Sequence, residues 1–310
     1  MTRVIAIMNQ KGGVGKTTTT VNLGAALSEK LFKVLLIDLD PAGSMTQWLS
    51  GEHSDNHPGL ADLLDGESPD ENITRKSERL GLDYIPAGNR LRDLATNGSF
   101  GLYMLKDRLK ESIKNYDFIL IDCPPSSDIL VGNALLASDY IIIPIQTETL
   151  PLQAGIKFLD WLDEFSERNQ SSINIMGLLP CMYDSRTRLS KLILDAMRSS
   201  ENIGPLVFDT VIRKNVRLAE LSASDRSIFR SASTSYGASD YSDLAIEVLE
   251  KSGLALPDPS QAQSSITGVD EDPGSVKIES ESDVELVYRD SGSGEYVMTE
   301  PTEEPDGYLN

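Results

Sequence analysis

Cysteine is nearly absent from this 310-residue sequence, which contains only Cys123 and Cys181, both within apolar segments. A chain of this length buries about three quarters of its unfolded surface on folding, so its core needs no disulfide or metal. The shortage of cysteine therefore excludes a disulfide-stabilised secreted scaffold and indicates a protein of a reducing, cytoplasmic compartment.

Long hydrophobic runs are also missing. No apolar segment approaches the ~18 residues that a membrane-spanning helix requires. The opening stretch, "MTRVIAIMNQ", is too soon interrupted by polar residues to be a signal peptide. We therefore expect neither a membrane span nor a secretion signal.

Basic residues are outnumbered, with 28 Lys and Arg against 48 Asp and Glu, and the formal net charge is −20. Residues 256–310 carry 14 acidic and 2 basic residues, a net of −12, which leaves −8 for residues 1–255. This sign disfavours nucleic acid as a partner, although a whole-chain sum does not reveal local patches. The last segment is also rich in Ser, Gly and Pro. We therefore predict one domain over residues 1–255 and an acidic, disordered tail over residues 256–310.

Short, continuous apolar segments rich in β-branched residues recur along the chain and indicate strands buried on both faces, as in a parallel sheet. The expected strands are Val4–Asn9, Val34–Asp38, Leu82–Ala87, Phe118–Asp122, Tyr140–Pro144 and Ile175–Leu179. Amphipathic segments predict helices at Thr17–Lys30, Leu102–Lys114, Leu150–Arg168, Leu189–Ser199 and Ser239–Lys251. The alternation predicts an α/β fold with a doubly wound, mostly parallel sheet, whose sites lie at the carboxyl ends of the strands.

A glycine-rich loop, "QKGGVGKTTT", joins the first expected strand to the first expected helix. Its glycines let backbone N–H groups surround phosphate oxygens, and the helix N-terminus adds positive potential. Lys16 is expected to hold the β- and γ-phosphates of ATP, and the Thr17 hydroxyl to ligate Mg²⁺. The usual loop has a glycine where this chain has Gln10, followed here by a second lysine, Lys11. The residues expected to bind the nucleotide are Gly12, Gly13, Val14, Gly15, Lys16, Thr17 and Thr18.

Acidic residues follow two of the expected strands. Asp38 and Asp40 occur in "VLLIDLDPAGS", and Asp122 occurs in "FILIDCPPS". A carboxylate at a strand end suits Mg²⁺, commonly through a coordinated water. We expect Asp38 and Asp122, with Thr17, to form the metal site. Asp40 lies further into its loop and could orient the attacking water.

Together, "KGGVGKTTT", "LLIDLDPAGS" and "LIDCPPS" resemble the deviant Walker A, Walker A′ and Walker B motifs of the ParA/MinD ATPases. The ParA/Soj branch, which segregates DNA, is the most similar, and the resemblance covers roughly residues 1–252. It implies that Lys11 is the signature lysine that reaches across a sandwich homodimer to the partner's ATP. It also implies that Gly12 lies where two loops approach closely, and that Lys11, Lys16 and Asp40 are the catalytic residues.

The resemblance leaves open what the dimer binds. MinD-type membrane binding uses a basic amphipathic helix at the C-terminus, whereas this C-terminus is acidic and an anionic membrane would repel it. We therefore expect no membrane partner, but non-specific double-stranded DNA on the nucleoid and a ParB-like centromere-binding protein that stimulates hydrolysis. The alternative is a ParA-like ATPase that positions a non-DNA cargo on the nucleoid.

Local basic clusters are the candidates for DNA contact. They supply Arg186, Arg188, Arg213, Lys214 and Arg217. Phosphate contacts of this kind give affinity without sequence information. The family commonly has Pro-Arg-Asn where this chain has Arg213-Lys214-Asn215, which leaves both the purine contacts and the DNA surface open.

Overall fold

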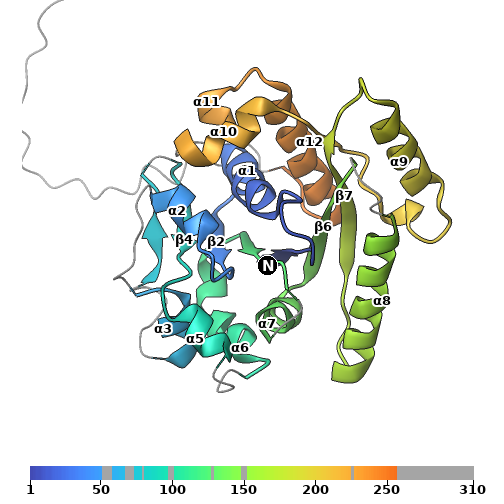
Figure 1. Ribbon diagram of the computed structural model, residues 1–310. Coiled ribbons are helices and arrows are strands. Elements are labelled where there is room, and N and C mark those ends of the chain that lie inside the picture. Colours follow the sequence, from blue (N-terminus) through green and yellow to red (C-terminus); the bar gives the residue numbers. More distant parts are fainter. Residues whose placement is uncertain are drawn as a thin grey trace, which may run out of the picture. The chain divides into compact units, whose positions relative to one another are not determined.

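The computed structural model describes residues 1–50, 58–66, 73–78, 80–96, 101–126, 129–147, 152–224 and 227–256. These residues form a central sheet with helices on both of its faces (Figure 1). Residues 257–310, nearly all of the predicted acidic tail, lie outside the described part, as does the predicted helix start at Leu150.

The sheet has eight strands in the part of the chain that the structure describes, in the order β3-β4-β2-β5-β1-β6-β7-β8. The strands are β1 (Arg3–Ile7), β2 (Val34–Asp38), β3 (Arg75–Lys76), β4 (Asp83–Ile85), β5 (Phe118–Asp122), β6 (Tyr140–Gln146), β7 (Ile175–Tyr183) and β8 (Ile212–Arg213). Neighbouring strands are parallel except for β3 and β4, which are antiparallel. The predicted doubly wound, mostly parallel sheet is confirmed.

Two helical layers cover the sheet (Figure 1). One face packs against α1 (Lys16–Glu29), α2 (Ser44–Ser50), α10 (Val216–Ser224), α11 (Ile228–Ser231) and α12 (Tyr236–Lys251). The other packs against α3 (Leu60–Asp65), α5 (Leu91–Thr96), α6 (Met104–Ser112), α7 (Ile129–Ala137), α8 (Leu152–Asn169) and α9 (Arg188–Ser199). Short 3₁₀ turns occur at Ile113–Asn115 and Gly204–Leu206. Every residue of β2 and β5 is buried, as expected for strands covered on both faces.

The central strands end in register. Ile7 of β1 and Asp38 of β2 both pair with Asp122 of β5. The loops that follow these three strands therefore leave the same edge of the sheet, where an α/β fold places its site.

Two strands run further than the sequence predicts. β6 continues past Pro144 to Gln146, and β7 continues past Leu179 to Tyr183. Pro144 has no backbone N–H to donate, but its carbonyl still accepts a 2.7 Å hydrogen bond from Asn9 Nδ2. The extension carries Gln146 to the glycine-rich loop.

Candidate functional site

The glycine-rich loop between β1 and α1 is an open cradle. Gly13 and Gly15 have φ angles of 72° and 99°, in the left-handed region that disfavours other residues. A Cβ built on Gly12, Gly13 or Gly15 would meet no atom within 4 Å. Gly12 has neither a positive φ nor a close neighbour in this chain, so nothing within one subunit requires a glycine there.

Lys16 begins α1 and is buried, with 7% of its surface exposed. Its Nζ lies 3.3 Å from the carbonyl oxygen of Lys11, to which it donates. Burial lowers the pKa of Lys16, while Asp122 and Asp40 act in the opposite direction. The first N–H groups of α1 also lack intrahelical acceptors. The loop therefore presents a buried ammonium and free backbone donors around an open space, which suits the phosphates of a nucleotide.

Thr17 and Asp122 meet at the base of this cradle. The Thr17 hydroxyl donates a 2.6 Å hydrogen bond to Asp122 Oδ2. Asp122 Oδ1 is buried and has no hydrogen-bond partner among the described residues. Burial, and then the charge of Asp38, raise the pKa of Asp122 well above its ordinary value. A hydroxyl beside a carboxylate with an unsatisfied buried oxygen fits Mg²⁺, whose charge would stabilise the ionised form.

Asp38 lies behind this pair, with its carboxylate engaged by protein donors. Its Oδ2 accepts hydrogen bonds from the backbone N–H and the hydroxyl of Thr46, at 2.7 and 2.6 Å. Its Oδ1 accepts a 3.2 Å bond from the N–H of Asp40. Burial raises the pKa of Asp38 to about 6. Of the three residues expected at the metal, the structure brings Thr17 and Asp122 into direct contact, while Asp38 holds the loop that carries Asp40.

Asp40 stands at the edge of the cradle, half-buried, and its Oδ1 accepts a 2.9 Å hydrogen bond from the N–H of Ala42. Its charge acts to raise the pKa of Lys16, against the larger effect of burial. Lys11 is exposed at the loop mouth, and its Nζ donates a 2.8 Å hydrogen bond to Gln146 Oε1. No pattern in the sequence predicts this contact with Gln146.

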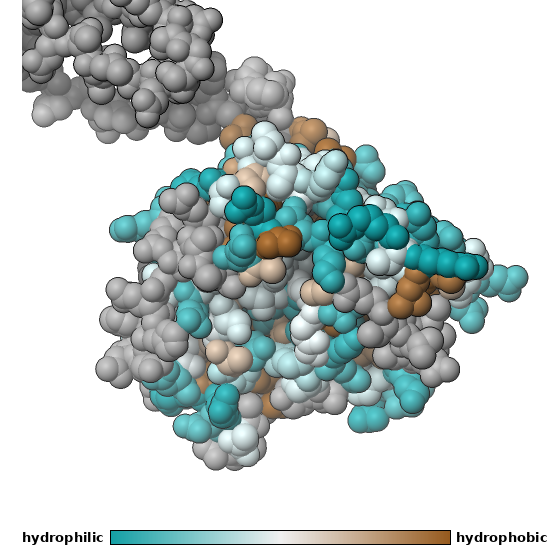
Figure 2. All heavy atoms as spheres, turned by 45° about the horizontal axis from the view of Figure 1, so that its top comes forward, coloured by the Kyte–Doolittle hydropathy of each residue, from teal (hydrophilic) through white to brown (hydrophobic). Residues whose placement is uncertain are grey.

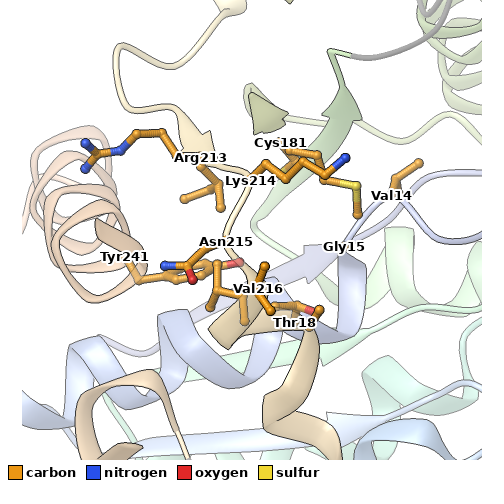
Figure 3. A pocket seen from close by; sticks show the side chains of 13 residues that line it. Val14, Gly15, Thr18, Cys181, Arg213, Lys214, Asn215, Val216 and Tyr241 are labelled. Carbon is orange, nitrogen blue, oxygen red and sulfur yellow. The ribbon is translucent and has the colours of Figure 1, made fainter. Parts of the chain in front are cut away.

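An apolar pocket of about 270 Å³ opens beside the loop (Figure 3). Its walls come from the glycine-rich loop, the end of β7, the β8–α10 segment and α12. They comprise Val14, Gly15, Thr18, Cys181, Met182, Ile212, Arg213, Lys214, Asn215, Val216, Leu218, Ala219 and Tyr241. Ligand pockets are mostly apolar with a few polar groups, and this one adjoins the phosphate cradle through Val14, Gly15 and Thr18. This pocket is therefore a candidate site for the purine base, whose contacts the sequence left open.

The predicted basic residues lie at or after the ends of β7 and β8, which are neighbouring strands. These strand ends are at the sheet edge that carries the glycine-rich loop. Arg186 and Arg188 follow β7, whereas Arg213, Lys214 and Arg217 lie at and after β8. The side chains of Arg188, Lys214 and Arg217 are exposed. Two exposed guanidiniums pair with nearby carboxylates, that of Arg186 with Asp184 at 2.8 Å and that of Arg217 with Glu220 at 3.5 Å.

Arg213, also predicted as a DNA contact, is held by α12. Its Nε donates a 2.9 Å hydrogen bond to the buried carboxylate of Asp240, and the guanidinium lies 4.2 Å from the centroid of the Tyr236 ring. Figure 3 shows this side chain directed away from the pocket, toward α12. Arg213 therefore fastens β8 to α12, with 36% of its side chain still exposed, and its contact with DNA stays a prediction.

Comparison with known proteins identifies the family. A family model described as an AAA domain matches residues 2–175. The sporulation initiation inhibitor protein Soj of Bacillus subtilis is 38% identical over 251 residues, which cover 80% of this chain and 98% of Soj. This chain belongs to the ParA/Soj family. The chromosome partitioning protein ParA of Caulobacter vibrioides is 35% identical over 254 residues, which cover 80% of this ParA/Soj-family chain and 94% of that protein.

A solved structure shares the fold. The structure of cobyrinic acid a,c-diamide synthase from Mycobacterium smegmatis with bound ADP and magnesium has a TM-score of 0.69 and 31% identity, covering 83% of this chain and 98% of its own. This ParA/Soj-family protein is a partition ATPase that uses ATP and Mg²⁺. Within the described residues, no helix is both long enough and apolar enough to cross a membrane.

Proposed function

We propose that the chain is an ATP-driven dimeric switch for DNA partition. In this proposal the ATP-bound dimer binds DNA without sequence preference, which makes the protein nucleoid-associated. A ParB-like centromere-binding partner stimulates hydrolysis, and the resulting cycle of binding and release segregates a plasmid or chromosome. The observation that carries the proposal is the contrast between two lysines of one loop, because Lys16 is buried in the cradle while Lys11 is exposed at its mouth.

The residues of the cradle divide the chemistry of hydrolysis between them. Lys16 and the first N–H groups of α1 hold and neutralise the phosphates, and Asp40 is placed to orient the attacking water. Thr17 and Asp122 would hold Mg²⁺, with Asp38 positioning the Asp40 loop behind them. Bound Mg²⁺ supplies charge neutralisation for the transferring phosphoryl group, which is the main requirement of this reaction.

The surroundings of Gly12 support the dimer. Glycine is not required at this position by any contact or backbone angle within the chain. A loop that excludes side chains for a reason outside its own subunit is expected where a second subunit approaches. In that arrangement the exposed Lys11 reaches the partner's nucleotide, so that ATP is part of the interface and its hydrolysis weakens the dimer.

Exposed cations support the DNA-binding part of the proposal. Arg188, Lys214 and Arg217 lie on loops and helix starts that leave adjacent strands, although the whole chain is acidic. On the face that carries the tops of α9 to α12, hydrophilic side chains dominate and apolar ones form only small separate groups (Figure 2). Such a face suits a phosphate backbone better than an apolar partner.

The test is binding to a duplex of arbitrary sequence, measured by fluorescence anisotropy with ATP or ADP. We expect binding with ATP only. If the dimer makes about seven phosphate contacts, affinity should fall roughly 10³- to 10⁴-fold between 50 and 200 mM salt. Arg217→Glu should weaken it strongly, whereas Lys106→Glu, an exposed site on α6 across the sheet, should not. An ATP-bound dimer that ignores DNA at low salt would contradict the DNA-binding part.

A further inference from the structure

We propose that Thr46, in the first turn of α2, is a positioning residue for ATP hydrolysis. Its hydroxyl holds the carboxylate of Asp38, and Asp38 in turn holds the loop that places Asp40 beside the attacking water. The inference rests on the proposed role of Asp40. Thr46 acts through Asp38 and is not itself a catalytic residue.

The Thr46 hydroxyl lies between two buried groups that fix its direction. Its oxygen accepts a 3.0 Å hydrogen bond from the N–H of Ala87, and its proton is donated to Asp38 Oδ2 at 2.6 Å. A backbone N–H only donates and an ionised carboxylate only accepts, so the hydroxyl serves once as acceptor and once as donor. Thr46, Asp38 and Ala87 are all buried, so bulk water does not compete for these bonds.

The Asp38 carboxylate joins the two ends of the loop that carries Asp40. Its Oδ1 accepts the 3.2 Å hydrogen bond from the N–H of Asp40, and its Oδ2 accepts the 2.7 Å bond from the N–H of Thr46. This Thr46 N–H is one of the first-turn donors that lack an acceptor within the helix. Residues 38–46 are therefore closed through one carboxylate, and the Thr46 hydroxyl adds a side-chain donor to it.

The elements on either side of Thr46 belong to the core. On α2, Leu49 is buried, and its carbonyl accepts a 2.8 Å hydrogen bond from Ser77 Oγ. Ala87 follows β4, which pairs with β2. Thr46 thus connects the Asp40 loop to two fixed elements. Loss of its hydroxyl would loosen the loop without removing any group from the phosphate cradle.

Two substitutions of Thr46 separate positioning from general support of the fold. Thr46→Val keeps the shape of the side chain and removes the hydroxyl, whereas Thr46→Ser keeps the hydroxyl and removes the methyl group. Thr46→Val should lower kcat about 10- to 100-fold, because a small displacement of a reacting group slows the chemical step. Its KM for ATP should change less than about threefold, and Thr46→Ser should keep kcat within about threefold of the wild type.

Ser77→Ala is the matched control. It removes the buried side-chain hydrogen bond at the other end of α2, so it should lower the stability of the fold in urea. Since Ser77 does not contact Asp38, the variant should keep the kcat of the wild type. Steady-state phosphate release measures kcat and KM for all of these proteins.

Hydrogen exchange followed by NMR, without nucleotide or Mg²⁺, gives a second readout. In the wild type, the N–H groups of Asp40, Thr46 and Ala87 should exchange slowly, because each donates to a buried acceptor. In Thr46→Val, those of Asp40 and Ala87 should exchange about tenfold faster or more, since local opening becomes easier. Fast exchange at these three positions in the wild type would overturn the inference, even if Thr46→Val failed to fold.

Asp40→Ala distinguishes failure of the inference from failure of the proposed function. If Asp40→Ala loses hydrolysis while Thr46→Val keeps the kcat of the wild type, the inference is wrong. It is also wrong if Thr46→Ser or Ser77→Ala loses as much kcat as Thr46→Val, because Thr46 then only supports the fold. If Asp40→Ala hydrolyses ATP as fast as the wild type does, Asp40 does not orient the water, and its proposed role is itself wrong.

Discussion

The hydroxyl of Thr17 donates a 2.6 Å hydrogen bond to Asp122 Oδ2, joining the first turn of α1 to the end of β5 across 105 residues of sequence. The second oxygen of Asp122 is buried and has no partner among the described residues. The protein thus supplies a hydrogen-bond donor to only one of the two Asp122 oxygens, and the other oxygen is suited to a cation.

Replacing Asp122 by asparagine should stabilise the protein without nucleotide or Mg²⁺ at alkaline pH. A carboxyl whose folded pKa is raised favours the folded state while protonated, and that stability is lost as the pH rises from its ordinary value through the raised one. The neutral amide of the Asp122→Asn variant does not ionise. In urea unfolding from pH 5.5 to 8, the advantage of Asp122→Asn should therefore grow with pH. If the variant's gain in free energy of unfolding were constant across this range, it would contradict a raised pKa of Asp122 in the folded protein.

Asp240→Ala should destabilise the fold by about 2–4 kcal/mol, because it leaves the partly buried guanidinium of Arg213 without its carboxylate. Urea unfolding measures the loss, and Arg213→Leu should show a similar one. The double variant should lose less than the sum of the two. The exposed pair Asp107–Lys110 provides the control, since Asp107→Ala should change stability little. Strictly additive losses would show that Arg213 and Asp240 are not coupled.

Ala219→Phe should weaken ATP binding by filling the pocket beside the loop, which Ala219 lines. Inorganic tripolyphosphate has no base and should bind the variant and the wild type equally well. Calorimetry with both ligands measures the difference. Equal loss for ATP and tripolyphosphate would show that the substitution disturbs the phosphate cradle, and no loss for either would place the base elsewhere.

Gly12→Val should leave folding intact, because a Cβ at Gly12 meets nothing within 4 Å. Monomer nucleotide binding should also persist, because Gly12 would contribute only its backbone N–H to the nucleotide, and valine keeps that group. It should abolish the ATP-dependent dimer, where the two loops meet. Thermal unfolding, ADP binding and sedimentation with ATP measure the three properties. A variant that still dimerises would remove Gly12 from the interface.

The central part of the site could be predicted from sequence because its chemistry is local. Gly13, Gly15, Lys16 and Thr17 are consecutive or nearly so, and the strand that delivers Asp122 is a continuous buried run. The predicted bounds of β2 and β5 match the structure for the same reason.

The remaining features depend on residues that are distant in sequence. Arg213 looks like a surface cation until α12 brings Asp240 against it, and β8 is only two residues long, too short for a periodic pattern. Gln146 escapes prediction because a proline, Pro144, interrupts the apolar run of its strand. Its contacts with Lys11 and Gly13 arise only when β6 pairs beside β1.

The central claim is that Lys11, which lies outside its own phosphate pocket, couples ATP binding to DNA binding. The most direct measurement is binding of an arbitrary duplex at low salt by the wild type and Lys11→Ala, each with ATP and with ADP. We predict that ATP switches on salt-sensitive binding in the wild type and that Lys11→Ala binds no better with ATP than with ADP. Equal ATP-dependent binding by the two proteins would contradict the claim.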